Sequence, residues 1–209
     1  MIDEAPYDPA AASQALAQAD PTLGDVIARV GPPTIRFGRG RTVFESVLRS
    51  VVYQQLSGKA AGTIYGRVLA LFPDKQPTAE ALLALDPDLL RGAGLSRAKT
   101  AAAFDLARKT VDGDLPDADA LAQMGDAEVG RRLVAVRGVG PWTAQMVMLF
   151  DLGRPDVWPT GDLGVQRGLQ FLDGLDALPD VSYMTGRAVV WRPWRSVAAW
   201  YLWRVADGR

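Results

Sequence analysis

Apolar residues recur at the 3.6-residue spacing of an α-helix through most of this chain, and the alternation typical of β-strands is almost absent. Glycine, proline and helix N-cap residues divide this pattern into short segments. We therefore expect an all-α protein. The predicted helices cover residues 8–19, 21–30, 42–56, 58–72, 78–85, 96–113, 125–136, 141–151, 162–172 and 193–206.

The length and composition favour a folded protein of one domain or two small lobes. The chain has 209 residues, of which 48% are hydrophobic and 22% are charged, which is enough apolar material for a real core. We expect residues 1–41 to form N-terminal helices that pack with the C-terminal lobe, and residues 42–151 to form a helical bundle ending in a helical hairpin. Residues 152–209 then supply a loop and the C-terminal helices.

The chain contains neither cysteine nor histidine. The absence of cysteine excludes disulfides, a thiolate nucleophile and an iron–sulfur cluster. The absence of histidine removes the usual zinc sites and the Ser-His and Cys-His arrangements. Acid–base chemistry near neutral pH must therefore come from Asp, Glu, Lys, Tyr or water.

Charge is unevenly distributed along the sequence. The net charge is −1 and the pI is about 5.5, which is unusual for a nucleic-acid-binding protein. Residues 181–206, however, contain no acidic residue. This segment leaves room for local basic faces, although the net charge counts against strong non-specific binding. Its arginines are Arg187, Arg192, Arg195 and Arg204.

A break in the helical pattern at Gly138-Val139-Gly140 is followed at once by Pro141. Glycine allows left-handed backbone and close approach of another backbone, and proline is favourable in the first helical turn. The free N–H groups at the start of the second helix would bind an anion such as a phosphate. The alternative is an ordinary tight turn. A weaker version of this anion-binding pattern occurs at residues 91–96. The alternative there is an ordinary glycine-rich connection with Ser96 as the N-cap of the next helix.

Asp162 follows W-P-T-G and precedes a helical pattern, so we place it at a helix N-terminus. One interpretation is a simple N-cap. The other is a functional carboxylate that the helix N-terminus holds ionised and that stabilises positive charge on a sugar. Asp151 and Asp156 are competing candidates in less constrained places.

All six tryptophans fall between residues 142 and 203. Trp200 and Trp203 have helical i, i+3 spacing and are predicted to lie in the core. Trp142 and Trp194 stand at helix starts, where they either pack or form aromatic walls for a stacked base. The polar residues Gln54, Gln55 and Ser57 of the segment Y-Q-Q-L-S, together with Leu56, then form either a capped turn or a probe that enters the gap left by a flipped base.

Taken together, these segments resemble the helix-hairpin-helix DNA glycosylase superfamily, and within it the DNA-3-methyladenine glycosylase II type. The resemblance covers about residues 42–205, with its motifs in family order. The resembling segments are V-V-Y-Q-Q-L-S-G-K-A-A, G-L-S-R-A-K-T, V-R-G-V-G-P-W-T-A, D-V-W-P-T-G-D-L-G-V-Q-R and W-R-P-W-R-S-V-A-A-W-Y-L-W.

The resemblance implies an all-α, two-lobed fold with a helix-hairpin-helix motif and an interlobe cleft that receives a flipped base. It implies that Asp162 is the catalytic aspartate and that Trp142, Met146 and Trp194 line the base pocket. It also implies DNA contacts and a monovalent cation, Na+ or K+, bound through backbone carbonyls. The DNA-contacting residues are Gly138, Val139, Gly140, Gln54, Gln55, Leu56, Ser57, Gly94 and Ser96, with Leu56 or Ser57 as the wedge, and the carbonyls are those of Val134, Val136 and Val139.

Three departures from relatives refine the expected activity. Trp142 stands where lyase-active relatives have a lysine, so no Schiff-base nucleophile is expected there. No C-terminal cysteine cluster is present. Only residues 1–41 precede the bundle, so we expect no N-terminal β domain. The resemblance therefore implies a monofunctional glycosylase that excises alkylated purines by hydrolysis and requires no cofactor.

The expected partner is double-stranded DNA with a damaged base, bound by a monomer. No secretion signal or membrane span is evident, so the expected location is cytoplasmic, on the nucleoid if the source is bacterial. The alternatives are a glycosylase for another damaged base, a non-catalytic DNA-binding helix-hairpin-helix protein, and a plain helical interaction protein.

Overall fold

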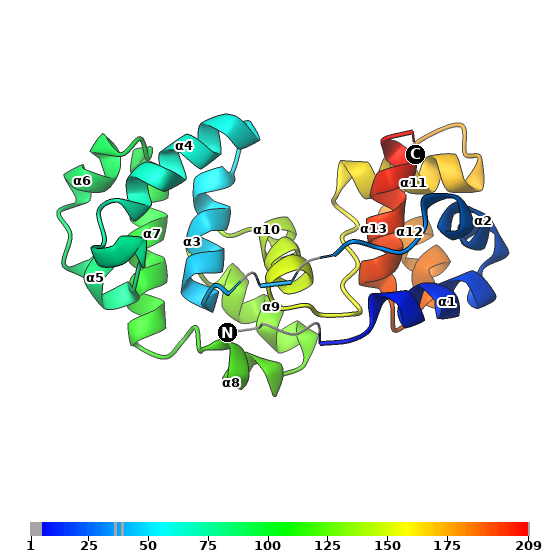
Figure 1. The fold of residues 1–209 in the computed structure, drawn as a ribbon, viewed down its shortest axis with the longest axis horizontal. Helices are drawn as coiled ribbons and strands as arrows, with labels where there is room; N and C mark the ends of the chain where they lie inside the picture. Colours follow the sequence, from blue (N-terminus) through cyan, green and yellow to red (C-terminus); the bar gives the residue numbers. More distant parts are fainter. Residues whose placement is uncertain (1–5, 36, 39, 209) are drawn as a thin grey trace. The chain divides into compact units, whose positions relative to one another are not determined.

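The computed structural model describes residues 6–35, 37–38 and 40–208. All regular structure in these residues is helical, and no strand occurs among them (Figure 1). The all-α prediction is therefore confirmed. Among the described residues, one compact unit runs from Gly38 to Val147, and a second combines the residues up to Phe37 with those from Met148 onward.

The first unit is built around α7 (Arg97–Val111), which packs against α3 (Val43–Tyr53) and α5 (Ala79–Leu83). Fully buried aliphatic residues on α3 and α7, such as Val51 and Leu106, form its core. The remaining helices are α4 (Gly58–Leu69), α6 (Pro87–Gly92), α8 (Ala118–Ala122), α9 (Asp126–Val134) and α10 (Pro141–Met146), with a 3-10 turn at Pro73–Lys75.

The second unit is built around α13 (Arg195–Ala206), whose residues 196–202 are all buried. This helix packs against α11 (Leu163–Asp173) and also against α1 (Pro9–Ala19) and α2 (Pro21–Val30). The unit also contains α12 (Val181–Arg187) and a 3-10 turn at Ala188–Trp191. A π-helical turn, Val147–Asp151, follows α10 and carries the chain into this unit.

Side-chain caps set where most helices begin. Thr42 accepts a hydrogen bond from Glu45 N–H at the start of α3, and the Glu45 carboxylate accepts one from Thr42 N–H, which completes a capping box. Asp86, Asp117 and Asp180 cap α6, α8 and α12, three helices that the sequence pattern did not predict. These helices have five to seven residues, which is too short to show a helical period.

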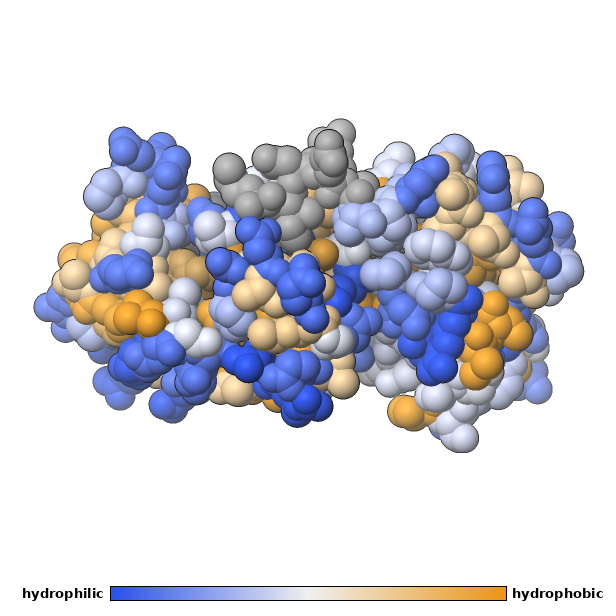
Figure 2. Space-filling model, turned by 90° about the horizontal axis from the view of Figure 1, so that it is seen from below, coloured by the Kyte–Doolittle hydropathy of each residue, from blue (hydrophilic) through white to orange (hydrophobic). Residues whose placement is uncertain are grey.

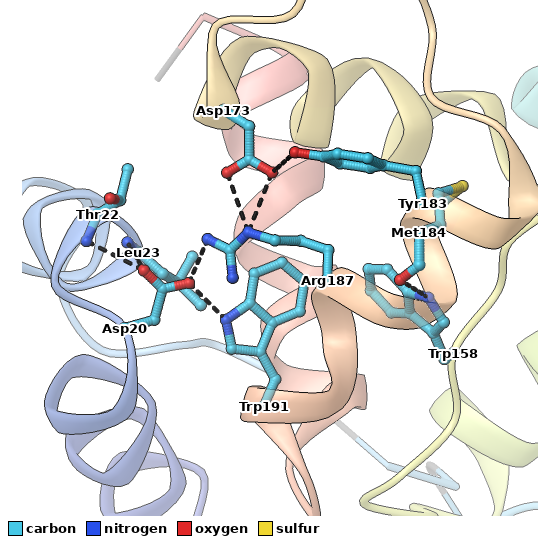
Figure 3. Close-up of polar contacts among 9 residues, drawn as sticks. All are labelled: Asp20, Thr22, Leu23, Trp158, Asp173, Tyr183, Met184, Arg187 and Trp191. Atoms are coloured by element: carbon cyan, nitrogen blue, oxygen red, sulfur yellow. Dashed lines mark hydrogen bonds and ion pairs between the residues drawn. The ribbon is translucent and has the colours of Figure 1, made fainter.

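An ionic network fixes the N-terminal helices of the second unit to its C-terminal half (Figure 3). Asp20 caps α2 and is 6% exposed; its Oδ2 accepts hydrogen bonds from Arg187 Nη2 at 2.5 Å and from Trp191 Nε1 at 2.8 Å. Arg187 also donates to Asp173, which in turn accepts from the Tyr183 hydroxyl. A single arginine therefore joins the start of α2 to the end of α11.

The network lowers the pKa of Asp20. Burial alone would raise that pKa, but hydrogen bonds from Arg187, Trp191 and Leu23 N–H outweigh it. Because the pKa is lower in the folded state, the stabilisation is present above the ordinary Asp pKa and is lost as the pH falls through the lowered value.

We expect Asp20→Asn to lower the free energy of unfolding by about 2–3 kcal/mol at pH 7, since Arg187 keeps only Asp173 as a charged partner. The difference from wild type should shrink as the pH falls through the acid range. Urea unfolding at several pH values measures both effects. Asp88→Asn, which breaks an exposed pair with Arg91, is the control and should cost less than about 1 kcal/mol. Equal losses in the two variants would contradict the assignment.

The helices α11 and α13 approach each other closely at a glycine. A Cβ atom built on Gly168 would lie 2.1 Å from the Leu202 carbonyl oxygen and 2.6 Å from its carbonyl carbon, both of which are backbone atoms. Neither atom can move without moving α13. The position therefore requires glycine because of space and not because of backbone conformation.

We expect Gly168→Ala to destabilise the protein by about 2–4 kcal/mol, because α13 must shift to accept the methyl group. The control is Gly186→Ala in α12, where an added Cβ meets nothing within 4 Å. Alanine is the better helix former, so this variant should be neutral or stabilise by up to about 1 kcal/mol. Thermal unfolding followed by circular dichroism compares the two, and an unchanged melting temperature in Gly168→Ala would refute the close packing.

Hydrophilic residues predominate on the face of the molecule drawn in Figure 2, and hydrophobic residues form small separate groups over it. Several large apolar side chains of the second unit are exposed, among them Phe171 and Val181. None of the helices in the described part of the chain is both long and apolar enough to cross a membrane.

Candidate active site

Asp162 lies at the N-terminus of α11, as the sequence predicts. The turn before it is closed by a hydrogen bond from Asp162 N–H to the Pro159 carbonyl at 3.0 Å. Its Oδ1 accepts a hydrogen bond from Val165 N–H at 2.9 Å, which is the N-cap geometry. The side chain is 8% exposed. Asp162 is therefore a buried carboxylate at the positive end of a helix dipole.

A second donor reaches the same oxygen. The indole N–H of Trp203, on α13, donates to Asp162 Oδ1 at 2.8 Å. The Trp203 ring also stacks on Phe150, with 5.5 Å between ring centroids and 24° between ring planes. The sequence predicts that Trp203 lies in the core, whereas the structure leaves it half-buried, with its indole N–H on the candidate catalytic group.

The competing carboxylates have other surroundings. Asp156 is bound by Arg195, whose Nε and Nη2 donate to Oδ1 at 2.6 Å and to Oδ2 at 2.8 Å. A bidentate ion pair of this kind neutralises the carboxylate and fixes its orientation. Asp151 is buried in the π-helical turn. Of these three acids, only Asp162 stands at a helix N-terminus.

The helix–turn–helix predicted from the helices at 125–136 and 141–151 is present as α9, a tight turn and α10. Gly138 has φ +77°, a left-handed conformation that favours glycine. Gly140 is the N-cap of α10 and, like every glycine, offers no side chain to cap the N–H groups of the first turn. On the other side of the turn, Arg137 N–H donates to Asp105 Oδ2 at 2.8 Å. Among the described residues no side chain caps α10, and an uncapped helix start is the kind of position at which backbone N–H groups bind a phosphate.

Gln54 connects this turn to the end of α3. Its Nε2 donates to the Gly138 carbonyl at 2.9 Å and to Thr143 Oγ1 at 3.3 Å. Lys99 Nζ in turn donates to the backbone carbonyls of Val52 at 2.8 Å and Gln54 at 2.7 Å, and burial lowers the pKa of this lysine. The Gln54 side chain, predicted to contact DNA, therefore also holds the loop that follows α3 against the hairpin.

The loop between α3 and α4 exposes three consecutive residues. Gln55 is exposed and has φ +55°, a left-handed conformation that is uncommon outside glycine. Leu56 is 39% exposed, whereas the Ser57 hydroxyl accepts a hydrogen bond from Ala60 N–H and caps α4. Both predicted wedge residues stand at this loop. The choice between Leu56 and Ser57 stays a prediction, and the strained backbone of Gln55 is a signal that the sequence did not carry.

The second glycine-rich turn, before α7, has both a left-handed glycine and a serine N-cap. Gly94 has φ +114°, and a Cβ there would meet Ile64 Cγ1 at 3.1 Å. Ser96 caps α7 by accepting a hydrogen bond from Lys99 N–H at 3.3 Å. The N-cap interpretation of Ser96 is thus present in the structure, and DNA contact by Gly94 and Ser96 stays a prediction.

The predicted base-pocket residues divide between the two units. Trp142 in the first turn of α10 is 47% exposed, and Met146 ends that helix half-buried. Trp194 is the N-cap residue of α13 in the second unit and lies 5.4 Å from the Tyr7 ring, which lies 5.3 Å from Phe37. Sequence reasoning missed this aromatic cluster because Tyr7 and Phe37 lie far from Trp194 along the chain.

Tyr7 has an unusual environment within this aromatic cluster. Its hydroxyl oxygen is buried and has no hydrogen-bond partner among the residues that the structure describes. Burial raises the pKa of Tyr7 well above its usual value, so the hydroxyl stays a neutral donor.

The predicted cation ligands are carbonyls at the end of α9 and in the turn that follows. Val134 ends α9, and the Val136 carbonyl already accepts a hydrogen bond from Val139 N–H at 3.0 Å. The last carbonyls of a helix carry partial negative charge, and each oxygen has two lone pairs, so this chemistry suits a monovalent cation. Binding of Na+ or K+ by Val134, Val136 and Val139 stays a prediction.

The arginines of residues 181–206 are mostly committed to contacts inside the second unit. Arg187 is bound by Asp20 and Asp173, and Arg195 by Asp156. Arg204 lies over the Trp200 ring, 4.0 Å from its centroid. Arg192 is exposed. Two of the four arginines, Arg187 and Arg195, are therefore paired with carboxylates, which reduces the positive charge available for a local basic face.

We expect Lys99→Met to destabilise the protein by about 2–3 kcal/mol, because two carbonyls at the end of α3 lose a charged donor. Lys59→Met is the matched control, since Lys59 is exposed on α4, and it should change the free energy of unfolding by less than about 0.5 kcal/mol. Urea unfolding gives both values. A Lys99 variant as stable as its control would rule out the capping role.

Comparisons with known proteins identify the family of this chain. Residues 48–193 match the family described as HhH-GPD superfamily base excision DNA repair protein. The chain is 32% identical to DNA-3-methyladenine glycosylase 1 of Schizosaccharomyces pombe over 164 residues, which are 78% of this chain and 72% of that protein.

Two solved structures are also similar. The structure of the S. pombe 3-methyladenine DNA glycosylase Mag1 in complex with abasic DNA has a TM-score of 0.80 and 30% identity, covering 93% of this chain and 95% of that one. A DNA-3-methyladenine glycosidase from Bacillus halodurans has a TM-score of 0.86 and 32% identity, covering 98% and 90%.

The chain therefore belongs to the HhH-GPD superfamily of base excision DNA repair proteins. The relatives named above are 3-methyladenine glycosylases, which confirms the predicted family type.

Proposed function

We propose that this protein is a monofunctional DNA glycosylase that removes alkylated purines of the 3-methyladenine type by hydrolysing the N-glycosidic bond. The observation that carries the proposal is the buried Asp162 carboxylate at the N-terminus of α11, in a chain whose relatives are named for this activity. We further propose that it binds damaged double-stranded DNA as a monomer.

The chemistry suits a site without histidine. A purine alkylated at N3 or N7 carries positive charge, so it leaves as a neutral base when its bond to the sugar C1′ breaks. No strong general acid is then needed. The positive charge moves to the sugar, where the negative Asp162 carboxylate stabilises it. Water adds to C1′ and gives up one proton, which completes the hydrolysis.

Lyase chemistry would require an amine nucleophile at the sugar. The lysines of the chain are Lys59, Lys75, Lys99 and Lys109, and none of them lies in the hairpin helices α9 and α10. Trp142 occupies the hairpin position at which lyase-active relatives have lysine. These two observations support base release without strand cleavage.

We expect Asp162→Asn to lower the single-turnover rate of 7-methylguanine release from duplex DNA by about 100-fold or more, because the charge is lost while Oδ1 still accepts the same hydrogen bonds. Affinity for an abasic-site duplex should change little. The control is Asp156→Asn, which removes a carboxylate paired with Arg195. Released bases are identified by mass, and undiminished release by Asp162→Asn would refute the assignment.

The same assay separates the proposed substrate class from others. Duplexes with a deaminated or an oxidised purine are compared with the methylated duplex under single-turnover conditions. Faster release of a neutral lesion than of a cationic one would favour a glycosylase for another damaged base. Tight binding to abasic DNA without any base release would favour a non-catalytic DNA-binding protein.

A further inference from the structure

Asp162 is held by two donors that come from different parts of the second unit. Val165 N–H belongs to the helix that Asp162 caps, so its hydrogen bond forms wherever an aspartate caps a helix. Trp203 Nε1 comes from α13 and donates to the same oxygen at 2.8 Å. The hydrogen bond from Val165 N–H is sufficient to cap α11, so capping does not explain the second donor.

The backbone of α11 is shaped to admit the indole. A Cβ atom on Gly164 would lie 2.6 Å from Trp203 Cδ1, 3.0 Å from Nε1 and 3.1 Å from Asp162 Oδ1. Any side chain at residue 164 would therefore displace the ring from the carboxylate. Gly164 has no left-handed backbone, so its requirement for glycine comes from this contact.

The other side of the indole is also fixed. Phe150, in the π-helical turn, stacks on the Trp203 ring at 5.5 Å between centroids. The ring is thus held between α11 and the π-helical turn, with its only donor directed at Asp162. A carboxylate held by one donor can still rotate about its Cβ–Cγ bond, whereas two donors on one oxygen restrict that rotation.

We propose that Trp203 is a positioning residue for the reaction: its indole N–H sets the orientation in which the Asp162 carboxylate faces the cationic sugar. The proposal rests on the proposed function of Asp162. Electrostatic stabilisation of a transition state requires that the charge be oriented before the reaction, and a small misplacement reduces the rate strongly. Trp203 supplies no atom to the chemistry.

The test is Trp203→Phe, which removes the donor and retains an aromatic ring beside Phe150. Trp200→Phe is the matched control, because Trp200 is a buried tryptophan one turn earlier on α13 that contacts Tyr201 and Arg204. Single-turnover release of 7-methylguanine should fall about 10- to 100-fold in Trp203→Phe. The control should stay within about twofold of wild type.

A second measurement separates positioning from a loss of structure. Affinities are compared for a duplex with a neutral tetrahydrofuran abasic analogue and one with a protonated pyrrolidine analogue, which mimics the cationic sugar. In Trp203→Phe the preference for the cationic duplex should fall about tenfold, while affinity for the neutral duplex stays unchanged. A merely structural role would weaken both affinities together and leave their ratio as in wild type.

Gly164→Ala is the second variant, since it keeps the tryptophan but displaces the indole. It should show both the lower release rate and the weaker preference for the cationic duplex. If Trp203→Phe does not fold, Gly164→Ala tests the positioning role in its place. The proposal would be overturned if both variants kept the wild-type ratio of affinities for the cationic and neutral duplexes, or if Trp200→Phe lost as much release rate as Trp203→Phe. If Asp162→Asn releases base at the wild-type rate, the proposed function itself fails. If only Asp162→Asn is impaired, the inference about Trp203 fails alone.

Discussion

The close contact between α11 and α13 is the constraint on which the candidate site depends. Gly168 lets the backbone of α11 rest against the Leu202 carbonyl, and one turn earlier Gly164 leaves space for the Trp203 ring. Because both helices are held at this distance, a side chain near the end of α13 reaches the cap at the start of α11. The orientation of Asp162 is therefore a result of helix packing as well as of its own N-cap hydrogen bond.

Much of the fold follows from local sequence signals. Pro21 after Asp20, Thr42 before a Glu three residues on, and Ser96 each mark a helix start that the structure contains. The five residues of α8 are too few to show a period of 3.6, whereas α5, which is equally short, is marked by Pro77 and the N-cap Thr78 before it. The predicted helix at 141–151 is divided into α10 and a π-helical turn, and nothing in its apolar pattern distinguishes the two hydrogen-bonding schemes.

The sequence predicted where the candidate site residues lie along the chain, but it did not predict which of them contact one another. The position of Asp162 at a helix start follows from W-P-T-G-D and the helical pattern after it. The hydrogen bond from Trp203 to Asp162, 41 residues away, depends on how α11 and α13 pack, and the i, i+3 spacing with Trp200 suggested only burial. The arginines show the same limit, since the partners of Arg187 include Asp20, which lies 167 residues away. Charge along the sequence could not reveal these pairs.

The attachment of the loop after α3 has a mechanical consequence. Lys99 holds the carbonyls at the end of α3, and Gln54 ties the next residue to the hairpin turn at Gly138 and to Thr143 on α10. In the proposed complex, DNA that presses on the exposed residues Gln55 and Leu56 would also press on α3, α7 and the turn at Gly138, to which the loop is hydrogen-bonded. In that complex the duplex would have to deform around Gln55 and Leu56, because these hydrogen bonds leave the loop little freedom to move.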